Sequence, residues 1–223
     1  GYAFNITRCE GYMECVAACV KENNLDRRSN TQYIRIFEME NGKMSPDVGD
    51  GKFFHKVPVA DHFYMGVQCF HCQNAPCVKA CPTKATWMEP DGIVVVDYDW
   101  CIGCRYCMVA CPFQVPAYEY YNPLTPQVRK CTFCFDYIKD GGLPACAQVC
   151  PREVITFGKK GDLLRLARWK MKNNPGKYVN HIYGEHEVGG TSWLYIASEP
   201  FATIGFPKLG TKAPPRLTES IQH

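Results

Sequence analysis

The apolar positions between residues 31 and 60 follow the period of β-strands. Residues 33–37 alternate apolar and polar side chains, and the Asn41-Gly42 pair after them favours a two-residue hairpin turn. Residues 53–59 are again rich in apolar side chains. We therefore expect residues 31–60 to form strands that brace the core.

A second hairpin is expected between residues 86 and 97. The segment Thr86-Trp87-Met88 precedes the turn sequence Pro90-Asp91-Gly92, and the β-branched run Ile93-Val94-Val95-Val96 follows it. β-branched side chains favour strands, whereas proline, aspartate and glycine together favour a turn. The pattern predicts a short antiparallel pair.

After residue 160 the apolar period becomes that of a helix. Asp162 is suited to cap this helix, and Asn173-Asn174-Pro175-Gly176 ends it. The side chains expected to face the core are those of Leu163, Leu164, Leu166, Ala167 and Met171. We expect a helix and a hairpin over residues 161–198. Residues 199–223 are rich in proline, glycine, threonine and lysine, which predicts an extended tail.

The hydropathy pattern predicts no membrane span. The best candidate, residues 193–206, is interrupted by Ser198, Glu199 and Pro200, and a span needs about 18 consecutive apolar residues. The sequence shows neither a signal peptide nor an initiator methionine, so we expect a removed leader or a start inside a longer chain. We expect a chain that is soluble by itself and contacts a membrane only through partners.

The net charge does not indicate a nucleic-acid partner. The formal charge of the 223-residue chain is +3, counted with every thiol neutral. If the cysteines bind iron as thiolates, each cluster with its ligands carries roughly −2, so the loaded protein is mildly acidic. There is also no run of lysine and arginine.

Cysteine spacing is the most informative chemical pattern. The fifteen cysteines form four groups, three of which end in Cys-Pro. One group has the spacing by which bacterial ferredoxins hold a [4Fe–4S] cluster with three thiolates and supply the fourth to a neighbouring cluster. That group is Cys101-x2-Cys104-x2-Cys107-x3-Cys111-Pro112. The first group departs from the pattern, because Tyr12 stands where the second cysteine is expected.

The spacing predicts which cysteines meet. The first three cysteines of a group wrap one cluster, whereas the fourth lies a helical turn further on and points toward the partner cluster. We therefore expect the groups to exchange their fourth cysteines. The predicted sets are site I (Cys69, Cys72, Cys77 and Cys111), site II (Cys101, Cys104, Cys107 and Cys81), site III (Cys131, Cys134, Cys146 and Cys19) and site IV (Cys9, Cys15 and Cys150, with Tyr12 at the vacant corner).

Three thiolates, with Tyr12 at the fourth ligand position, suit a [3Fe–4S] cluster, since a tyrosine with a pKa of about 10 does not easily replace a thiolate. The expected cofactors are three [4Fe–4S] clusters and one [3Fe–4S] cluster. Alternatively, Tyr12 shields a cluster that finds its fourth ligand elsewhere. Disulfides and zinc are further alternatives, but the odd cysteine count disfavours disulfides and the repeated triplet spacing disfavours zinc ribbons. We expect His71 to donate or accept a hydrogen bond near a cluster.

The pairing of the groups predicts the domain organisation. Two units of loop, short helix and hairpin form a pair, and the outer groups form a second pair around them. This predicts an α+β fold of two interleaved halves, each similar to a bacterial two-cluster ferredoxin, with added strands and an extended C-terminal tail. The outer half is expected to comprise residues 1–30 and 122–160, and the inserted inner half residues 61–121. Residues 31–60 are expected to form the bracing strands, residues 161–198 the C-terminal helix and hairpin, and residues 199–223 the tail.

Over roughly residues 5–160 the chain resembles the four-cluster iron–sulfur subunits of molybdopterin-oxidoreductase-type complexes. The matching stretches run from Gln68-Cys69 to Cys81-Pro82-Thr83, from Asp91-Gly92 to Cys111-Pro112, and from Lys130-Cys131 to Cys150-Pro151. The resemblance implies interleaved ferredoxin-like halves with pseudo-twofold symmetry. It also implies an electron-transfer role beside a catalytic subunit.

Two departures narrow the resemblance. Tyr12 replaces a cysteine, and Val20 replaces the usual proline. With these two departures and with residues 184–192, the chain resembles the branch of the family that includes the quinone reductase complex of sulfate reducers. That branch implies a molybdopterin-type large subunit, a quinone-binding integral membrane subunit and a multihaem cytochrome c. It also implies a peripheral position on the periplasmic side of the inner membrane, the alternative being the cytoplasm.

The expected function is electron transfer without catalysis by this chain. Four clusters form a path for electrons between a donor or catalytic subunit and a membrane quinone site. The sequence contains no nucleophilic triad, phosphate-binding loop or paired acidic motif. The alternatives are a free-standing polyferredoxin that diffuses between partners, and a redox enzyme in its own right.

Overall fold

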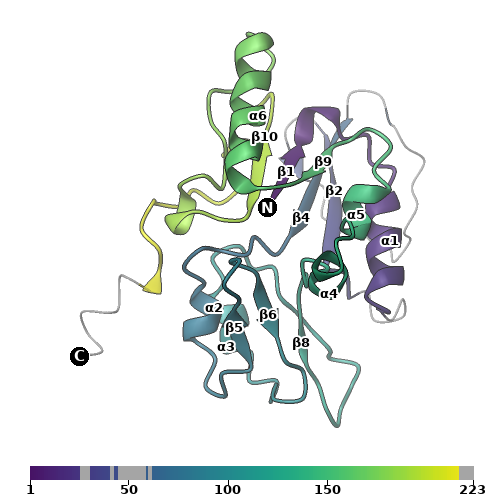
Figure 1. Cartoon of the computed structure of the whole chain (residues 1–223), viewed down its shortest axis with the longest axis vertical. Helices are drawn as coiled ribbons and strands as arrows, with labels where there is room; N and C mark the ends of the chain where they lie inside the picture. The colour runs from purple at the N-terminus through teal and green to yellow at the C-terminus, as the bar shows by residue number, and fades with distance from the viewer. Residues whose placement is uncertain (26–30, 41–42, 45–58, 60–61, 216–223) are drawn as a thin grey trace.

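A computed structural model describes residues 1–25, 31–40, 43–44, 59 and 62–215. Short helices and short strands surround the cysteine-bearing loops (Figure 1). This is the α+β class that the sequence predicts. One group of cysteine-bearing helices lies beside the long strands, a second lies next to a small hairpin at the bottom of the view, and the C-terminal helix stands at the top (Figure 1).

One sheet joins the two ends of the chain. Strand β1 (Tyr2–Asn5) pairs in parallel with β10 (Trp193–Ile196) and antiparallel with β9 (Ile155–Phe157). The rings of Tyr2 and Trp193 are stacked, with centroids 4.1 Å apart. Because β1 precedes the first cysteine group and β9 follows the last, this sheet brings those two groups together.

A second sheet combines strands from the predicted bracing segment with a strand over residues 62–68, which the sequence analysis had assigned to the inner half. Strand β2 (Ile34–Glu40) pairs antiparallel with β3 (Lys43–Met44) and along its whole length with β4 (His62–Gln68). The turn expected at Asn41-Gly42 lies outside the described part of the chain. The apolar segment expected at residues 53–58 also lies outside it.

Two hairpins complete the strands. β5 (Thr86–Met88) and β6 (Val94–Val96) pair antiparallel, which confirms the hairpin predicted there. At its turn Gly92 has φ +86°, a left-handed conformation that glycine adopts at little cost. The smaller hairpin pairs β7 (Ala117–Tyr118) with β8 (Val128–Arg129).

Each cysteine group runs from a loop into a short helix, as the sequence predicts. These helices are α1 (Glu14–Glu22), α2 (Pro76–Lys79), α3 (Tyr106–Ala110), α4 (Phe135–Lys139) and α5 (Ala145–Gln148). Helix α1 packs against α5, and α2 packs against α3 (Figure 1). The helices of the first and last groups therefore pack together, and so do those of the two middle groups.

The proline after the fourth cysteine explains where these helices end. The helices α2, α3 and α5 all end before Cys-Pro, since proline cannot continue a helix. In the first group Val20 takes the place of that proline, and α1 continues past Cys19 to Glu22. The longer helix places Asn23 where its side chain accepts a hydrogen bond from Thr132 Oγ1 (2.8 Å), beside Cys131.

Helix α6 (Lys160–Asn173) forms the expected C-terminal helix. The helix begins earlier than predicted, and its capping position is Lys159, not Asp162. Asp162 lies in the first turn, where its carboxylate pairs with Arg165. Leu163 and Ala167 are buried against β10 and its neighbours, as predicted. Strand β10 pairs with β1, and its contact with the segment preceding it is an isolated bridge between residues 183 and 195.

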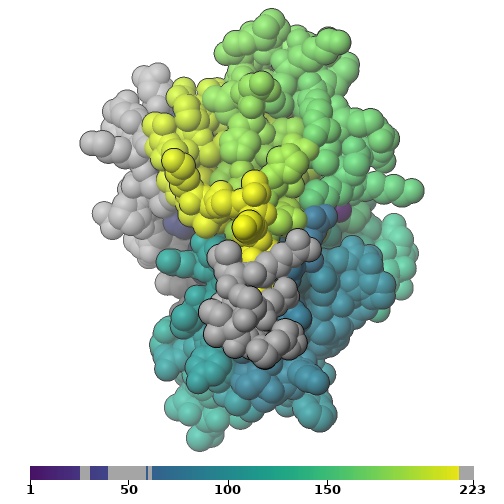
Figure 2. All heavy atoms as spheres, turned by 90° about the vertical axis from the view of Figure 1, so that its left-hand side faces the viewer, coloured from purple at the N-terminus to yellow at the C-terminus, as the bar shows by residue number. Residues whose placement is uncertain are grey.

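The described part of the tail packs on its own chain. It lacks regular structure but buries Phe201, Ile204 and Phe206, with Ile204 at 0% exposure. Figure 2 shows it lying across the face formed by the C-terminal segment, above the residues of the inner unit. Proline and glycine make this segment extended, whereas its few aromatic and aliphatic side chains fix its position. In the described part of the chain, no helix has the length and hydropathy that a membrane span requires.

Candidate iron–sulfur sites

The four cysteine loops share one backbone turn. The residue immediately before the second ligand position has positive φ in every loop: Gly11 (+73°), His71 (+45°), Gly103 (+67°) and Phe133 (+66°). Such angles are uncommon for residues other than glycine, so four occurrences at one motif position indicate a common loop geometry. The loop that contains Tyr12 has the same turn as the three loops that contain a complete motif.

Backbone N–H groups point at the sulfurs of these loops. The N–H of Phe133 donates to Cys131 Sγ and that of Val154 donates to Cys150 Sγ, both at 3.3 Å. Hydrogen bonds of this kind stabilise a thiolate and therefore suit a site that binds metal through sulfur. All fifteen cysteines are free thiols in the structure, with no disulfide among them.

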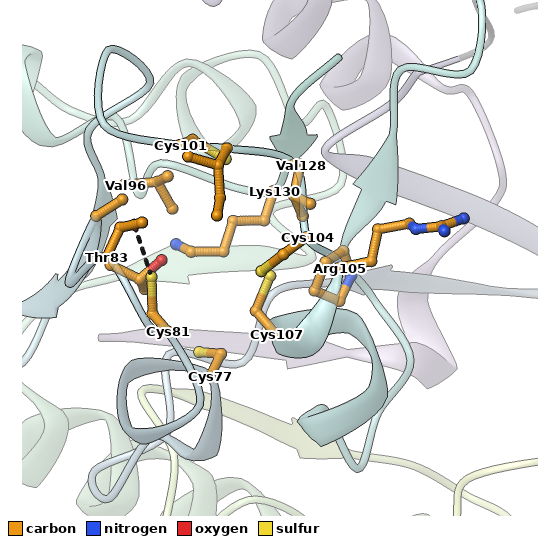
Figure 3. Close-up of a pocket in the computed structure, with 15 residues that line it drawn as sticks. Cys77, Cys81, Thr83, Val96, Cys101, Cys104, Arg105, Cys107, Val128 and Lys130 are labelled. Carbon is orange, nitrogen blue, oxygen red and sulfur yellow. Dashed lines mark hydrogen bonds between the residues drawn. The ribbon is translucent and has the colours of Figure 1, made fainter. Parts of the chain in front are cut away.

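The set named site II surrounds a cavity (Figure 3). Its walls include Cys81, Cys101, Cys104 and Cys107. The pKa of Cys107 is raised to about 11, first by burial and then by the charges of the neighbouring cysteines, Cys81 among them. For Cys81, burial raises the pKa but hydrogen bonds with Thr83 and Thr86 outweigh it, so that the net pKa is lowered. The cavity is thus lined by three thiols of one group and by two of another, the fourth thiol Cys81 and the third thiol Cys77.

The set named site I lies next to it. Burial raises the pKa of Cys72 well above its usual value, and the charges of Cys69, Cys111 and Cys77 raise it further. Cys111 is the fourth cysteine of the group that supplies site II. Cys111 and Cys81 therefore each lie among thiols of the other middle group, as the predicted exchange of fourth cysteines requires.

The first and last groups meet in the same way at site III. Burial raises the pKa of Cys19 well above its usual value, followed by the charges of Cys131, Cys146 and Cys134. Cys19 belongs to helix α1, whereas the other three thiols lie on the last group more than a hundred residues later. The sheet of β1 and β9 and the contact of α1 with α5 bring them together.

Site IV contains three thiols. The pKa of Cys9 is raised to about 12 by burial, and the charge of Cys150 contributes. The pKa of Cys15 is raised by burial and then by Cys9 and Cys150. Its remaining loop position, Tyr12, has an exposed side chain whose hydroxyl is hydrogen-bonded to Glu10, and this bond raises the pKa of Tyr12.

The raised thiol pKa values belong to the metal-free chain. Burial disfavours the charged thiolate, and iron supplies the compensating positive charge when it binds. The donor set therefore fits iron–sulfur clusters: soft sulfur ligands converge from separate loops, and backbone N–H groups face them. Among the described residues, no three side chains of His, Cys, Asp or Glu converge closely enough to hold a single metal ion.

Charge interactions between thiols indicate the order of the predicted sets. In each link burial is the largest cause of a raised thiol pKa, and the charge of a cysteine from a neighbouring set adds to it. The links are Cys15 with Cys146, Cys69 with Cys131, and Cys77 with Cys107. These interactions arrange the predicted sets in the order IV, III, I, II. Cysteine spacing had predicted the two pairs, and the link between sites III and I comes from the tertiary structure.

Two buried polar residues lie among the sets. His71 is 1% exposed, and its Nδ1 accepts a hydrogen bond from the backbone N–H of Val94 at 3.0 Å. Burial lowers its pKa well below the usual value, and the charge of Lys130 adds to this effect. Lys130 is 5% exposed and was overlooked in the sequence, because its position before Cys131 gives no sign that its long side chain turns inward.

Comparison with known proteins agrees with this geometry. The profile of the 4Fe-4S dicluster domain family matches residues 60–160. The Hydrogenase-2 operon protein HybA of Escherichia coli O157:H7 is 34% identical over 257 residues, covering 100% of this chain and 77% of HybA. The B subunit of the anaerobic dimethyl sulfoxide reductase of Escherichia coli K12 is 35% identical over 174 residues, covering 75% of this chain and 80% of the relative.

The chain belongs to the 4Fe–4S dicluster ferredoxin-like electron-transfer subunits. A further relative of this dicluster family member is a protein of Nitratidesulfovibrio vulgaris (Hildenborough), which is 39% identical over 222 residues. That alignment covers 98% of this chain but 60% of the relative, so the chain spans less than two thirds of that protein. The predicted fold and the iron–sulfur nature of the dicluster subunit are confirmed by these matches.

Proposed function

We propose that this dicluster subunit carries electrons through three [4Fe–4S] clusters and one [3Fe–4S] cluster, between a donor or catalytic subunit and a quinone-binding subunit in the membrane. The ligands are those of sites I to III for the cubes and Cys9, Cys15 and Cys150 for the three-iron cluster. The observation that carries the proposal is the order IV, III, I, II, in which every cysteine set adjoins the next. Electrons pass along such a series without any substrate-binding site.

Iron analysis combined with EPR spectroscopy tests the cluster content. Protein purified without oxygen should contain about 15 iron atoms per chain, and a [3Fe–4S] signal should be present in the oxidised state before any reductant is added. Stepwise reduction should then bring in signals from the three cubes. About 16 iron atoms per chain with no oxidised signal would contradict the three-iron assignment and leave the electron-transfer role intact.

An exposed apolar surface at site II supports a role inside a complex rather than as a free shuttle. Trp100 and Ile102 are each 67% exposed, Tyr106 is 61% exposed and Val109 is 87% exposed. All four lie within five residues of Cys104, whose thiol is exposed, on the loop and helix of the site II group. Exposed apolar side chains gathered in one segment are typical of a contact with another protein, and a partner there would lie close to the last cluster.

The partners follow from the relatives and from the sequence resemblance. HybA is named for a hydrogenase operon, and the second relative is named as part of a dimethyl sulfoxide reductase. For this chain we infer a molybdopterin-type large subunit, a quinone-binding integral membrane subunit and a multihaem cytochrome c, on the periplasmic side of the inner membrane. Affinity purification of the native complex with identification of its subunits tests the partners, and protease accessibility in spheroplasts tests the side.

A further inference from the structure

Lys130 follows β8 and extends its side chain into the region between the cysteine sets. Its ammonium donates hydrogen bonds to the backbone oxygen atoms of Val94 and, at 3.1 Å, of Cys131. The side chain lines the cavity of site II, and its nitrogen points into the space between Cys81 and Cys101 (Figure 3). Lysine side chains are rarely buried to this extent without a paired anion.

Lys130 has no carboxylate partner among the ion pairs of the described residues. The groups that it faces are cysteine sulfur atoms, which become negatively charged thiolates when they bind iron. Lys130 lines the wall of site II together with Cys77 of site I, and its ammonium donates a hydrogen bond to the backbone oxygen of Cys131 of site III at 3.1 Å. One buried cation is therefore shared by three of the four sets.

The neighbouring basic groups do not duplicate this charge. His71 accepts the N–H of Val94 at Nδ1, so that this nitrogen carries no proton and the ring adds no positive charge. Arg105 also borders the cavity, but its guanidinium lies over the ring of Tyr118, 5.2 Å from the centroid, and points away from the thiols (Figure 3). The field at sites I and II therefore depends chiefly on Lys130.

We propose that Lys130 raises the reduction potentials of the clusters at sites I, II and III relative to that at site IV. When such a cluster accepts one electron, its net charge becomes one unit more negative. A fixed cation in a buried, weakly polarisable environment stabilises that reduced state more than the oxidised state. Lys130 thus acts on the clusters through its charge and is not one of their ligands. The proposal rests on the proposed function, because it requires clusters at these sites.

Redox titration of the cluster-loaded protein, followed by EPR, tests the proposal. Lys130→Gln keeps a hydrogen-bond donor but removes the charge, whereas Lys130→Arg keeps the charge. We expect Lys130→Gln to weaken one-electron reduction at sites I, II and III at least tenfold, which is a fall of about 59 mV in midpoint potential, and Lys130→Arg to stay near the wild-type value. The [3Fe–4S] signal of site IV, read in the same samples, should keep its midpoint.

Lys79→Gln is the matched control. Lys79 lies on α2, the helix that bears Cys77, but its side chain is exposed, so that solvent screens its charge. Its removal should leave all midpoints unchanged. Lys130→Met removes both the charge and the donor and should lower the same midpoints as Lys130→Gln, so either variant that loads with iron decides the question.

Three outcomes overturn the proposal. One is an unchanged set of midpoints in fully loaded Lys130→Gln, with or without a lower melting temperature. A second is a fall in Lys130→Met that Lys130→Gln does not share, since hydrogen bonding would then be responsible. The third is an equal shift at all four sites. Failure of the proposed function is seen separately, in the wild-type protein, as iron content and EPR signals that do not correspond to four clusters.

Discussion

Tyr12 and Cys104 occupy equivalent positions on two loops with the same backbone turn. Each is preceded by a glycine in the left-handed region, Gly11 at φ +73° and Gly103 at φ +67°. Since the backbone fixes the direction of Cβ, a cysteine at position 12 would project from its loop as Cys104 projects from the loop of site II. The first group has therefore kept the loop geometry of a complete motif without its second thiol.

Tyr12→Cys is expected to complete site IV. The substitution supplies a fourth thiolate in a loop of suitable geometry, so the [3Fe–4S] signal of the oxidised protein should disappear and the iron content should rise by about one atom per chain. Tyr12→Phe is the control, because it removes the hydroxyl bonded to Glu10 without adding a ligand. An oxidised three-iron signal that persists in fully loaded Tyr12→Cys would refute the assignment of the vacant corner.

Gly11→Ala is expected to damage site IV. A Cβ at Gly11 would lie 2.5 Å from the ring of Tyr64, and the left-handed conformation adds about 1–2 kcal/mol of strain. The free energy of unfolding should fall by more than about 2 kcal/mol, with loss of the site IV signal. Thermal unfolding and EPR measure the two effects.

Gly92→Ala is the control that separates the effect of backbone strain from the effect of the clash with Tyr64 in Gly11→Ala. Gly92 also has positive φ, at +86°, but a Cβ there meets nothing within 4 Å. This variant should lose only about 1–2 kcal/mol, the strain alone, and retain all cluster signals. Equal losses in the two variants would show that the contact with Tyr64 is unimportant.

Serine substitutions test the exchange of fourth cysteines. Cys81→Ser and Cys101→Ser lie in different groups, but both thiols face Cys107 across one cavity, so both should eliminate or alter the same EPR signal, that of site II. Cys77 borders the same cavity, but after burial the thiols that raise its pKa most are Cys69 and Cys111, so Cys77→Ser should alter a different signal, that of site I. If Cys81→Ser and Cys77→Ser perturbed the same cluster and Cys101→Ser another, the groups would hold their clusters without exchange.

Ile204→Ala tests the packing of the tail on its own chain. Because Ile204 is fully buried, the truncation should reduce the free energy of unfolding by about 2–5 kcal/mol. Thr203→Ala, at an exposed position next to it, should change it by less than about 0.5 kcal/mol. Chemical denaturation of the loaded protein measures both, and similar small effects would mean that the tail does not contribute to the core.

Local chemistry made some elements predictable and others not. The hairpin of β5 and β6 follows from its own turn residues and β-branched runs, and the ends of the short helices follow from the prolines after the fourth cysteines. Asp162 was expected to cap α6, but the helix begins at Lys160 and the side chain of Asp162 pairs with Arg165 inside the first turn. The burial of Ile204 was not predictable from a segment whose composition is polar and rich in glycine and proline.

By itself the sequence determined the spacing of the cysteines, and from it came the prediction of four sets and a vacant corner, because ligand spacing is a local property and the reach of a helical turn limits which thiols can point together. Only the tertiary structure decided that sites III and I adjoin, through Cys131 and Cys69, and that Lys130 enters the space beside them. Both depend on sheets that pair strands far apart in the chain. The direction of a buried side chain is set by the neighbours that such pairing assembles, and those neighbours leave no periodic signal in the sequence.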